Sequence, residues 1–174
     1  MSNTNASHGD DLIDSVVGLT PGETLHATRH GREKVAAATQ GSYELFFDPA
    51  AGGLTIQERL LVAYYACVLS KSASLESHYH GLLEQNGVDA ASLETVARSG
   101  LEELQSGRLT AMLVFTAKLI QKPVEGDKAA VQALQAAGIS TPDIITLAQL
   151  IAFLSYQIRL TAGLQAMKAL ESQS

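Results

Sequence analysis

The last part of the chain contains a long apolar segment with a complete helix start, "STPDIITLAQLIAFLSYQIRLTAGLQAMKAL" (residues 140–170). Ser140 or Thr141 can cap the first turn, Pro142 has the fixed φ that suits it, and Asp143 complements the helix dipole. The most apolar stretch is shorter than a membrane span and is interrupted by polar residues, namely Gln149, Ser155, Gln157 and Arg159. We therefore predict a buried helix in a fold without a membrane segment.

A second helix with a complete start follows the loop "DPAAGGLT". Thr55 and Glu58 have the spacing of a capping box, which predicts a helix from residue 56 to about Leu69. This helix is apolar on nearly every side, so it belongs in the interior. We expect the 56–69 and 142–167 helices to pair in the core.

Shorter helical patterns fill the rest of the chain. Thr20 and Glu23 form another capping-box pattern, which predicts a helix from Pro21 that Gly31 interrupts and residues 32–47 resume. Further helices are expected at about 74–85, 90–99, 109–122 and 127–137. The strand pattern of alternating apolar and polar residues is missing. The sequence thus predicts a single all-α domain over residues 10–174, preceded by a disordered polar tail at residues 1–9.

Charge and cysteine content narrow the function classes. The formal net charge of −6 and the absence of a basic cluster argue against binding of nucleic acid or of an anionic membrane surface. One cysteine cannot form an internal disulfide, and the N-terminus lacks the apolar region of a signal peptide. We expect a cytoplasmic protein. Because phosphate-binding glycine loops and zinc motifs are also missing, no cofactor is predicted.

Cysteine and histidine are the first candidates for chemistry. Cys67 lies inside the apolar 56–69 helix, where a buried, inert thiol is expected. His78 and His80 are two residues apart, so on a helix they point to different sides and cannot share a metal. His26 and His30 have the i, i+4 spacing of a helical metal pair, but no third ligand is evident from the sequence and no metal site is predicted.

Arg159 is the most unusual charge, since it stands among apolar residues of the long C-terminal helix. A buried guanidinium needs a carboxylate, carbonyl groups or an anionic ligand. Glu58, at the start of the other core helix, is one candidate partner. Two interpretations remain open for Arg159: a structural salt bridge or subunit contact, and a ligand-binding cation.

Four segments together resemble the alkylhydroperoxidase D-like / carboxymuconolactone decarboxylase-like superfamily over about residues 54–165. They are "LTIQERLLVAYYACVL", "LESHYHGLLEQNGV", "LETV" and "AVQALQAAGISTPDIITLAQLIAFLSYQIRLTAGL". The N-terminal "DLIDSVVGLTPGETLHATRHGREKVAAATQGSYELFF" looks like the leader of a single-domain subgroup. The resemblance implies an all-α, AhpD-like helical domain that assembles as a homo-oligomer.

The redox residues of that superfamily do not carry over. The resemblance places its proton-relay glutamate at Leu60, its two CxxC cysteines at Ser72 and Leu75, and its histidine at Tyr79. Thiol peroxidase chemistry needs an attacking and a resolving thiol, so it is not expected. The decarboxylase branch also lacks the CxxC and has a histidine on the second helix.

Three functions are consistent with this resemblance. The first is an enzyme or binder for a small carboxylate or lactone, with His78 or His80 and Arg159 as the main pair and Glu58 beside them. The second is a non-catalytic structural or interaction protein that acts with an AhpD-like partner protein. The third is an atypical peroxidase-related oxidoreductase, which the missing CxxC makes the least supported.

Overall fold

The computed structural model describes residues 11–171, and the predicted tail at residues 1–9 lies outside this range. Within it every regular element is helical, so the predicted all-α class is confirmed. The elements are α1 (Leu12–Val17), α2 (Thr24–His30), α3 (Glu33–Phe46), α4 (Ile56–Ser70), α5 (Ala73–Gln85), α6 (Ala90–Ala97), α7 (Gly107–Gln121), α8 (Lys128–Ala136) and α9 (Thr141–Glu171), with short 3₁₀ turns at Leu101–Glu103 and Pro123–Glu125.

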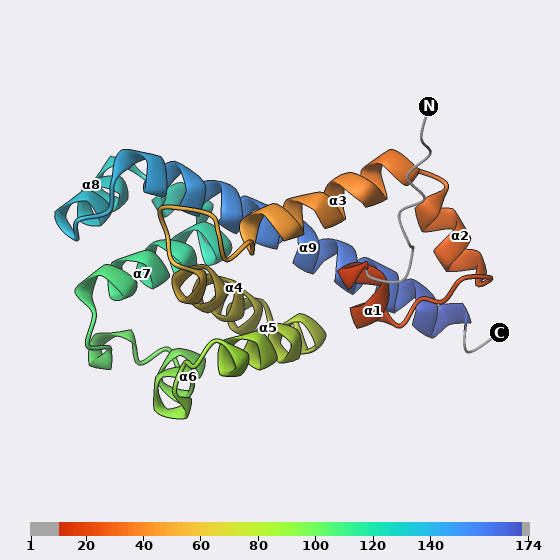
Figure 1. The fold of residues 1–174 in the computed structure, drawn as a ribbon, viewed down its shortest axis with the longest axis horizontal. Coiled ribbons are helices and arrows are strands. Elements are labelled where there is room, and N and C mark those ends of the chain that lie inside the picture. The colour runs from red at the N-terminus through yellow and green to blue at the C-terminus, as the bar shows by residue number, and fades with distance from the viewer. Residues whose placement is uncertain (1–10, 172–174) are drawn as a thin grey trace.

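The helices are arranged along α9, which runs the full length of the molecule (Figure 1). The antiparallel pair α4 and α5 packs with α7 and the first half of α9 to form the body, and α6 and α8 lie at its periphery. Helices α1 and α2 pack against the second half of α9 and form, with α3, an arm.

The core follows this division. One large cluster of buried apolar side chains fills the body, and α4 is its centre because every residue from Arg59 to Cys67 is buried. A small separate cluster joins the arm, made of Ile13, Val17, Leu19, Leu25 and Leu164. The predicted pairing of the two long apolar helices is confirmed, since α4 and α9 are in contact.

The helix starts follow the local capping signals. In α4 the Thr55 hydroxyl accepts from the Glu58 amide, and the Glu58 carboxylate accepts from the Thr55 amide, which completes the predicted capping box. The predicted start at Pro21 is wrong. Glu23 does accept from the Thr20 amide, but Pro21 and Gly22 form a turn and α2 begins at Thr24. Gly22 has a φ of 100°, which a helix cannot accommodate.

Helix α9 agrees with the helix predicted over residues 142–167 and extends a few residues beyond it. Its 31 residues are long and apolar enough to cross a membrane by length and composition. The central helix of a water-soluble domain meets the same criterion, and α9 packs against α1, α4 and α7 in the fold.

Candidate functional site

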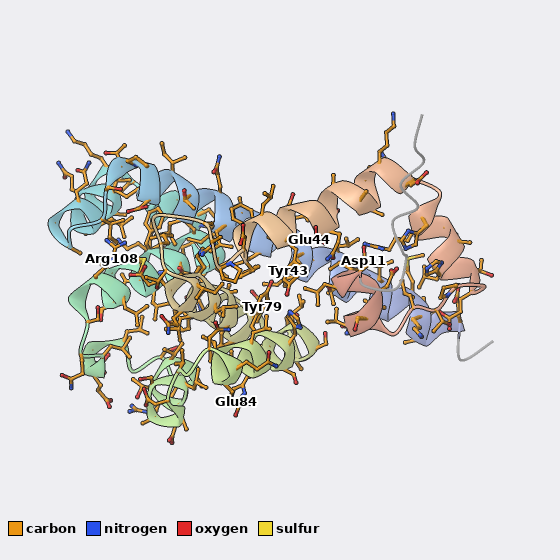
Figure 2. All side chains as sticks on the ribbon, in the orientation of Figure 1. Asp11, Tyr43, Glu44, Tyr79, Glu84 and Arg108 are labelled. Atoms are coloured by element: carbon orange, nitrogen blue, oxygen red, sulfur yellow. The ribbon has the colours of Figure 1, made fainter. Side chains whose placement is uncertain are left out.

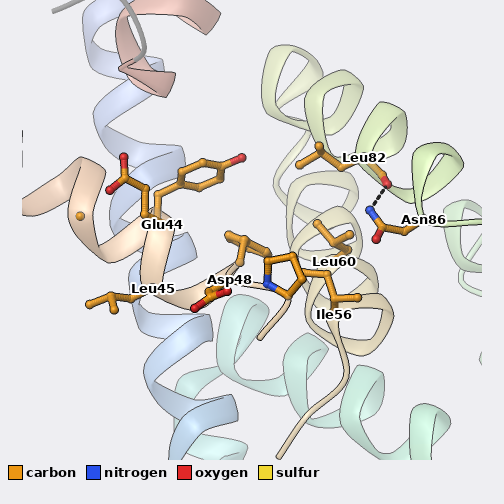
Figure 3. A pocket seen from close by; sticks show the side chains of 11 residues that line it. Glu44, Leu45, Asp48, Ile56, Leu60, Leu82 and Asn86 are labelled. Carbon is orange, nitrogen blue, oxygen red and sulfur yellow. Dashed lines mark hydrogen bonds between the residues drawn. The ribbon is translucent and has the colours of Figure 1, made fainter. Parts of the chain in front are cut away.

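A cavity of about 720 Å³ opens where the end of α3, the following loop, the start of α4 and the end of α5 meet (Figure 3). Most of its wall is apolar, as in small-molecule sites generally. The lining residues are Gly41, Tyr43, Glu44, Leu45, Phe47, Asp48, Pro49, Ile56, Leu60, Leu82 and Asn86.

A buried arginine fixes the loop that forms one wall of this cavity. The Arg59 guanidinium donates to the carbonyl oxygens of Phe46 at 2.7 Å, Asp48 at 3.0 Å and Thr55 at 3.3 Å. Only 2% of Arg59 is exposed, and burial lowers the pKa of its guanidinium. The loop is therefore held to α4 by a desolvated, charged donor, whose hydrogen bonds are stronger than neutral ones.

Tyr43 lines the cavity and contacts His78, which lies behind it and is not one of the lining residues. The Tyr43 hydroxyl and Nε2 of His78 are 2.9 Å apart, and the Tyr43 ring also packs on Phe47. Burial lowers the pKa of His78, and burial together with the nearby Glu44 charge raises the pKa of Tyr43. At neutral pH both groups are uncharged, so the pair can donate or accept a hydrogen bond without carrying charge.

The charges in the cavity wall are negative. Glu44 and Asp48 are its ionisable carboxylates, and none of its lining residues is a lysine or arginine. Asn86, the other polar side chain at the rim, donates to the Leu82 carbonyl at 2.8 Å (Figure 3). This cavity therefore favours a neutral, largely apolar molecule over an anion.

Three of the four positions at which the resemblance places redox residues are occupied by packing residues, and the fourth, Ser72, is half-buried just before α5. Leu60, Leu75 and Tyr79 are buried, and Leu60 forms part of the cavity wall. Tyr79 donates to Oε1 of Gln157 at 2.7 Å inside the core. Cys67 is also fully buried, and burial raises the pKa of its thiol well above the ordinary range, which opposes thiolate formation.

The four predicted site residues lie in separate environments. Among the described residues, no hydrogen bond or ion pair joins any two of Glu58, His78, His80 and Arg159. His78 contacts Tyr43 as described above. His80 lies on another side of α5, where its ring is 3.7 Å from the Glu84 carboxylate and contacts the ring of Tyr64. Figure 2 labels Glu84.

The prediction that Arg159 is buried is wrong. Arg159 is exposed on α9, and the buried guanidinium of the body belongs to Arg59. Glu58 is paired instead with Nε of Arg108 at 2.8 Å, and Arg108 also donates to the Gly138 carbonyl. Glu58 thus caps α4 and links it to α7. Flanking apolar residues are similar around Arg59 and Arg159, so the sequence did not distinguish them.

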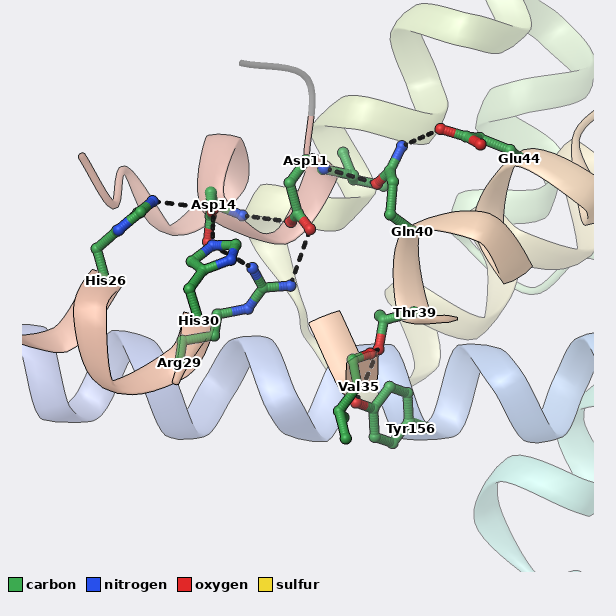
Figure 4. Close-up of polar contacts among 11 residues, drawn as sticks. Asp11, Asp14, His26, Arg29, His30, Val35, Thr39, Gln40, Glu44 and Tyr156 are labelled. Carbon is green, nitrogen blue, oxygen red and sulfur yellow. Dashed lines mark hydrogen bonds and ion pairs between the residues drawn. The ribbon is translucent and has the colours of Figure 1, made fainter. Parts of the chain in front are cut away.

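A second polar cluster lies in the arm, far along the chain from the cavity residues of α4 and α5. Asp14 of α1 meets His26 and His30 of α2, and their potential ligand atoms all lie within 4.8 Å of one another (Figure 4). The sequence identified the histidine pair but not Asp14, because the carboxylate comes from another helix.

Comparisons with known proteins agree with the fold. No protein-family model and no curated protein sequence matches the chain. Among solved structures, an uncharacterized peroxidase-related protein from Silicibacter sp. TM1040 superposes with a TM-score of 0.67 at 20% identity, over 74% of this chain and 66% of that one. The alignment thus covers just under two thirds of that protein's length. The chain shares its all-helical fold with a peroxidase-related protein.

Proposed function

We propose that this chain is a carboxymuconolactone decarboxylase-like protein that binds a small neutral molecule, of the lactone or ester class, in the cavity between α3, α4 and α5. The observation that carries this proposal is an apolar cavity lined by the Tyr43 hydroxyl, which contacts His78 behind it, and by no lysine or arginine. A lactone carbonyl accepts a hydrogen bond and needs no counter-charge. A carboxylate would face Glu44 and Asp48.

The Tyr43–His78 pair also determines what chemistry the site can support. His78 has a lowered pKa, so its imidazole is neutral at neutral pH, and it would act on a molecule in the cavity through the Tyr43 hydroxyl. Tyr43 has a raised pKa and keeps its proton; in the tautomer in which His78 Nε2 donates to the Tyr43 oxygen, the Tyr43 hydroxyl can donate to a bound molecule. His78 is therefore the predicted acid–base group. His80, Glu58 and Arg159 have less support, because their contacts lie elsewhere.

Binding measurements with matched ligands test the proposal. The full chain is titrated with a neutral aromatic or aliphatic lactone and with its ring-opened hydroxy acid, by calorimetry or thermal shift. We expect the lactone to bind and the acid to bind at least about tenfold more weakly. Tyr43→Phe should weaken lactone binding about 5- to 30-fold, because it removes the hydroxyl and keeps the ring.

A filling variant and a surface control complete the experiment. Leu82→Trp should reduce binding of any ligand by occupying the cavity, and Arg159→Ala should leave lactone binding unchanged. Tighter binding of the acid, lost in Arg159→Ala, would contradict the proposal and support the carboxylate site predicted from sequence.

One observation favours the alternative, a non-catalytic interaction protein. Large apolar side chains are exposed on α3 and on the second half of α9, including Leu45 at 76%, Met167 at 49% and Tyr156 at 42%. Such residues are common at subunit contacts. Light scattering of the wild type and of a Tyr156→Glu/Met167→Glu variant tests this alternative. The non-catalytic interaction protein is favoured if the wild type is an oligomer, the variant is a monomer, and neither binds a lactone. Peroxidase-related thiol chemistry has the least support, because the Cys67 thiol is buried in the core.

A further inference from the structure

Three side chains with metal-binding groups converge between α1 and α2. Asp14 Oδ2 lies 2.6 Å from Nε2 of His30 and 3.6 Å from Nε2 of His26 (Figure 4). His26 and His30 are one helical turn apart, with ring centroids separated by 4.3 Å, so both imidazoles face the same carboxylate.

The cluster is shielded from solvent. Asp14 and His26 are 6% and 7% exposed, and the side chain of His30 is 13% exposed. Ionisable groups are seldom buried unless they are paired or bind a ligand. Asp14 contacts both histidines in this enclosed space, so the three groups of donor atoms are brought together by the fold.

Arg29 orients the carboxylate. Its Nη1 donates to Asp14 Oδ1 at 2.8 Å, and its Nη2 donates to Asp11 Oδ2 at 3.0 Å. Oδ2 of Asp14 is thereby directed to the two imidazoles. Carboxylate ligands of metal sites are held by outer partners in the same way. Beside the two imidazoles, the cluster contains two carboxylates and one guanidinium.

The contacts of His30 are informative. Its Nε2 lies 3.0 Å from a donor, Arg29 Nη1, and 2.6 Å from an acceptor, Asp14 Oδ2. One ring nitrogen either carries a proton or has a lone pair, so it cannot satisfy both contacts at once. A cation between Nε2 and Oδ2 would use the lone pairs of both atoms, and Arg29 Nη1 would keep Asp14 Oδ1 as its acceptor.

The spacing also suits a tetrahedral ion. Metal–ligand distances of 2.0–2.2 Å for zinc correspond to ligand–ligand separations of about 3.3 Å. The two observed separations, 2.6 and 3.6 Å, bracket this value. Shifts of about 0.7 Å and about 0.3 Å would bring these two separations to it, and the separation between the two imidazole nitrogens lies within 4.8 Å. Two imidazoles and one carboxylate favour zinc or a related transition metal over calcium or magnesium, which prefer oxygen ligands.

We propose that Asp14, His26 and His30 bind a divalent transition metal ion of the zinc class, which thereby links α2 to α1. The site lies in the arm and is independent of the cavity proposed above. Three protein ligands leave a fourth position for water or another group.

Metal titration of the tag-free full chain, stripped with a chelator, tests this proposal. We expect one zinc ion per chain by calorimetry and elemental analysis, and a rise in Tm on zinc addition. His26→Gln and Asp14→Asn should each weaken zinc binding about 100-fold or more. His80→Gln, on the exposed part of α5, is the matched histidine control and should bind zinc as the wild type does.

Cobalt substitution gives a readout that needs no variant. Cobalt bound by the three side chains in a tetrahedral site should produce intense visible absorption that zinc abolishes. Circular dichroism establishes that each variant is folded. The proposal is overturned if folded His26→Gln binds zinc as tightly as the wild type, or if the wild type shows neither stoichiometric zinc binding nor the tetrahedral cobalt spectrum.

Discussion

The hydroxyl of Tyr79 on α5 donates a 2.7 Å hydrogen bond to Oε1 of Gln157 on α9, and both side chains are enclosed in the core. Removing the donor leaves a buried amide oxygen without its partner. We expect Tyr79→Phe to lower the free energy of unfolding by about 1–3 kcal/mol in urea denaturation. The double variant Tyr79→Phe/Gln157→Leu, which removes both polar groups, should cost less. An equal or larger loss in the double variant would contradict this account.

Arg59 should be important for stability, and Arg159 should not. Arg59→Met keeps an apolar stem but removes the donor to three carbonyl groups, so we expect a loss of about 1.5–3 kcal/mol in unfolding free energy. Hydrogen exchange in the 47–55 loop should also increase. Arg159→Met changes an exposed side chain and should stay within about 0.5 kcal/mol of the wild type. Similar losses in the two variants would refute the assignment.

Cys67 should be inert in the folded protein. Its thiol is buried and its pKa is raised, so we expect no reaction with Ellman's reagent at pH 8 until denaturant is added. For the same reason, incubation with an alkyl hydroperoxide and a dithiol should give no turnover. Turnover of the hydroperoxide by the wild type that is lost in Cys67→Ala would contradict this prediction.

Cys67 also predicts how stability depends on alkaline pH. Its folded pKa lies above the unfolded value of about 8.5, so the folded state holds the proton more tightly. The stabilisation that follows from the raised thiol pKa is fully present below about pH 8.5 and is lost progressively as the pH rises above that value. Cys67→Ala should therefore flatten the decline in unfolding free energy between about pH 8.5 and 9.5, before the tyrosines ionise. An unchanged slope would exclude Cys67 as the cause.

His78 has the opposite pH dependence. Burial lowers its folded pKa below the unfolded value of about 6.5, so its contribution to stability is present above that pH and is lost on acidification. His78→Gln should reduce the loss of unfolding free energy between about pH 7 and 5, relative to the wild type. His80→Gln provides the comparison, since His80 is 42% exposed in its side chain. Equal effects of the two substitutions would count against a half-buried, neutral His78.

Glu58 is expected to serve the fold. Its carboxylate accepts from the Thr55 amide and pairs with Arg108, so Glu58→Ala should lower the unfolding free energy by about 1–2 kcal/mol. Glu58→Gln retains an acceptor for the cap and should cost less. Ligand affinity of the cavity should be unchanged in Glu58→Gln, and a loss of affinity without a loss of stability would restore Glu58 as a site residue.

The sequence by itself determined the helical class and the main helix starts. Thr55 with Glu58, and the Ser-Thr-Pro-Asp start of α9, act on backbone groups a few residues away, so local chemistry was sufficient. The start of α2 was misplaced, because the Thr20–Glu23 contact occurs in a turn as well as at a helix start.

Tertiary structure decided the sites. Arg59 and Arg159 both stand among apolar residues, and only the packing of α3 and its loop onto α4 buries one of them while the other faces solvent. Asp14 joins His26 and His30 because α1 and α2 meet in the arm. The cavity depends on the ends of three helices. Such groupings join residues distant in the chain, and helix periodicity specifies a face of one helix but not the helix that covers it.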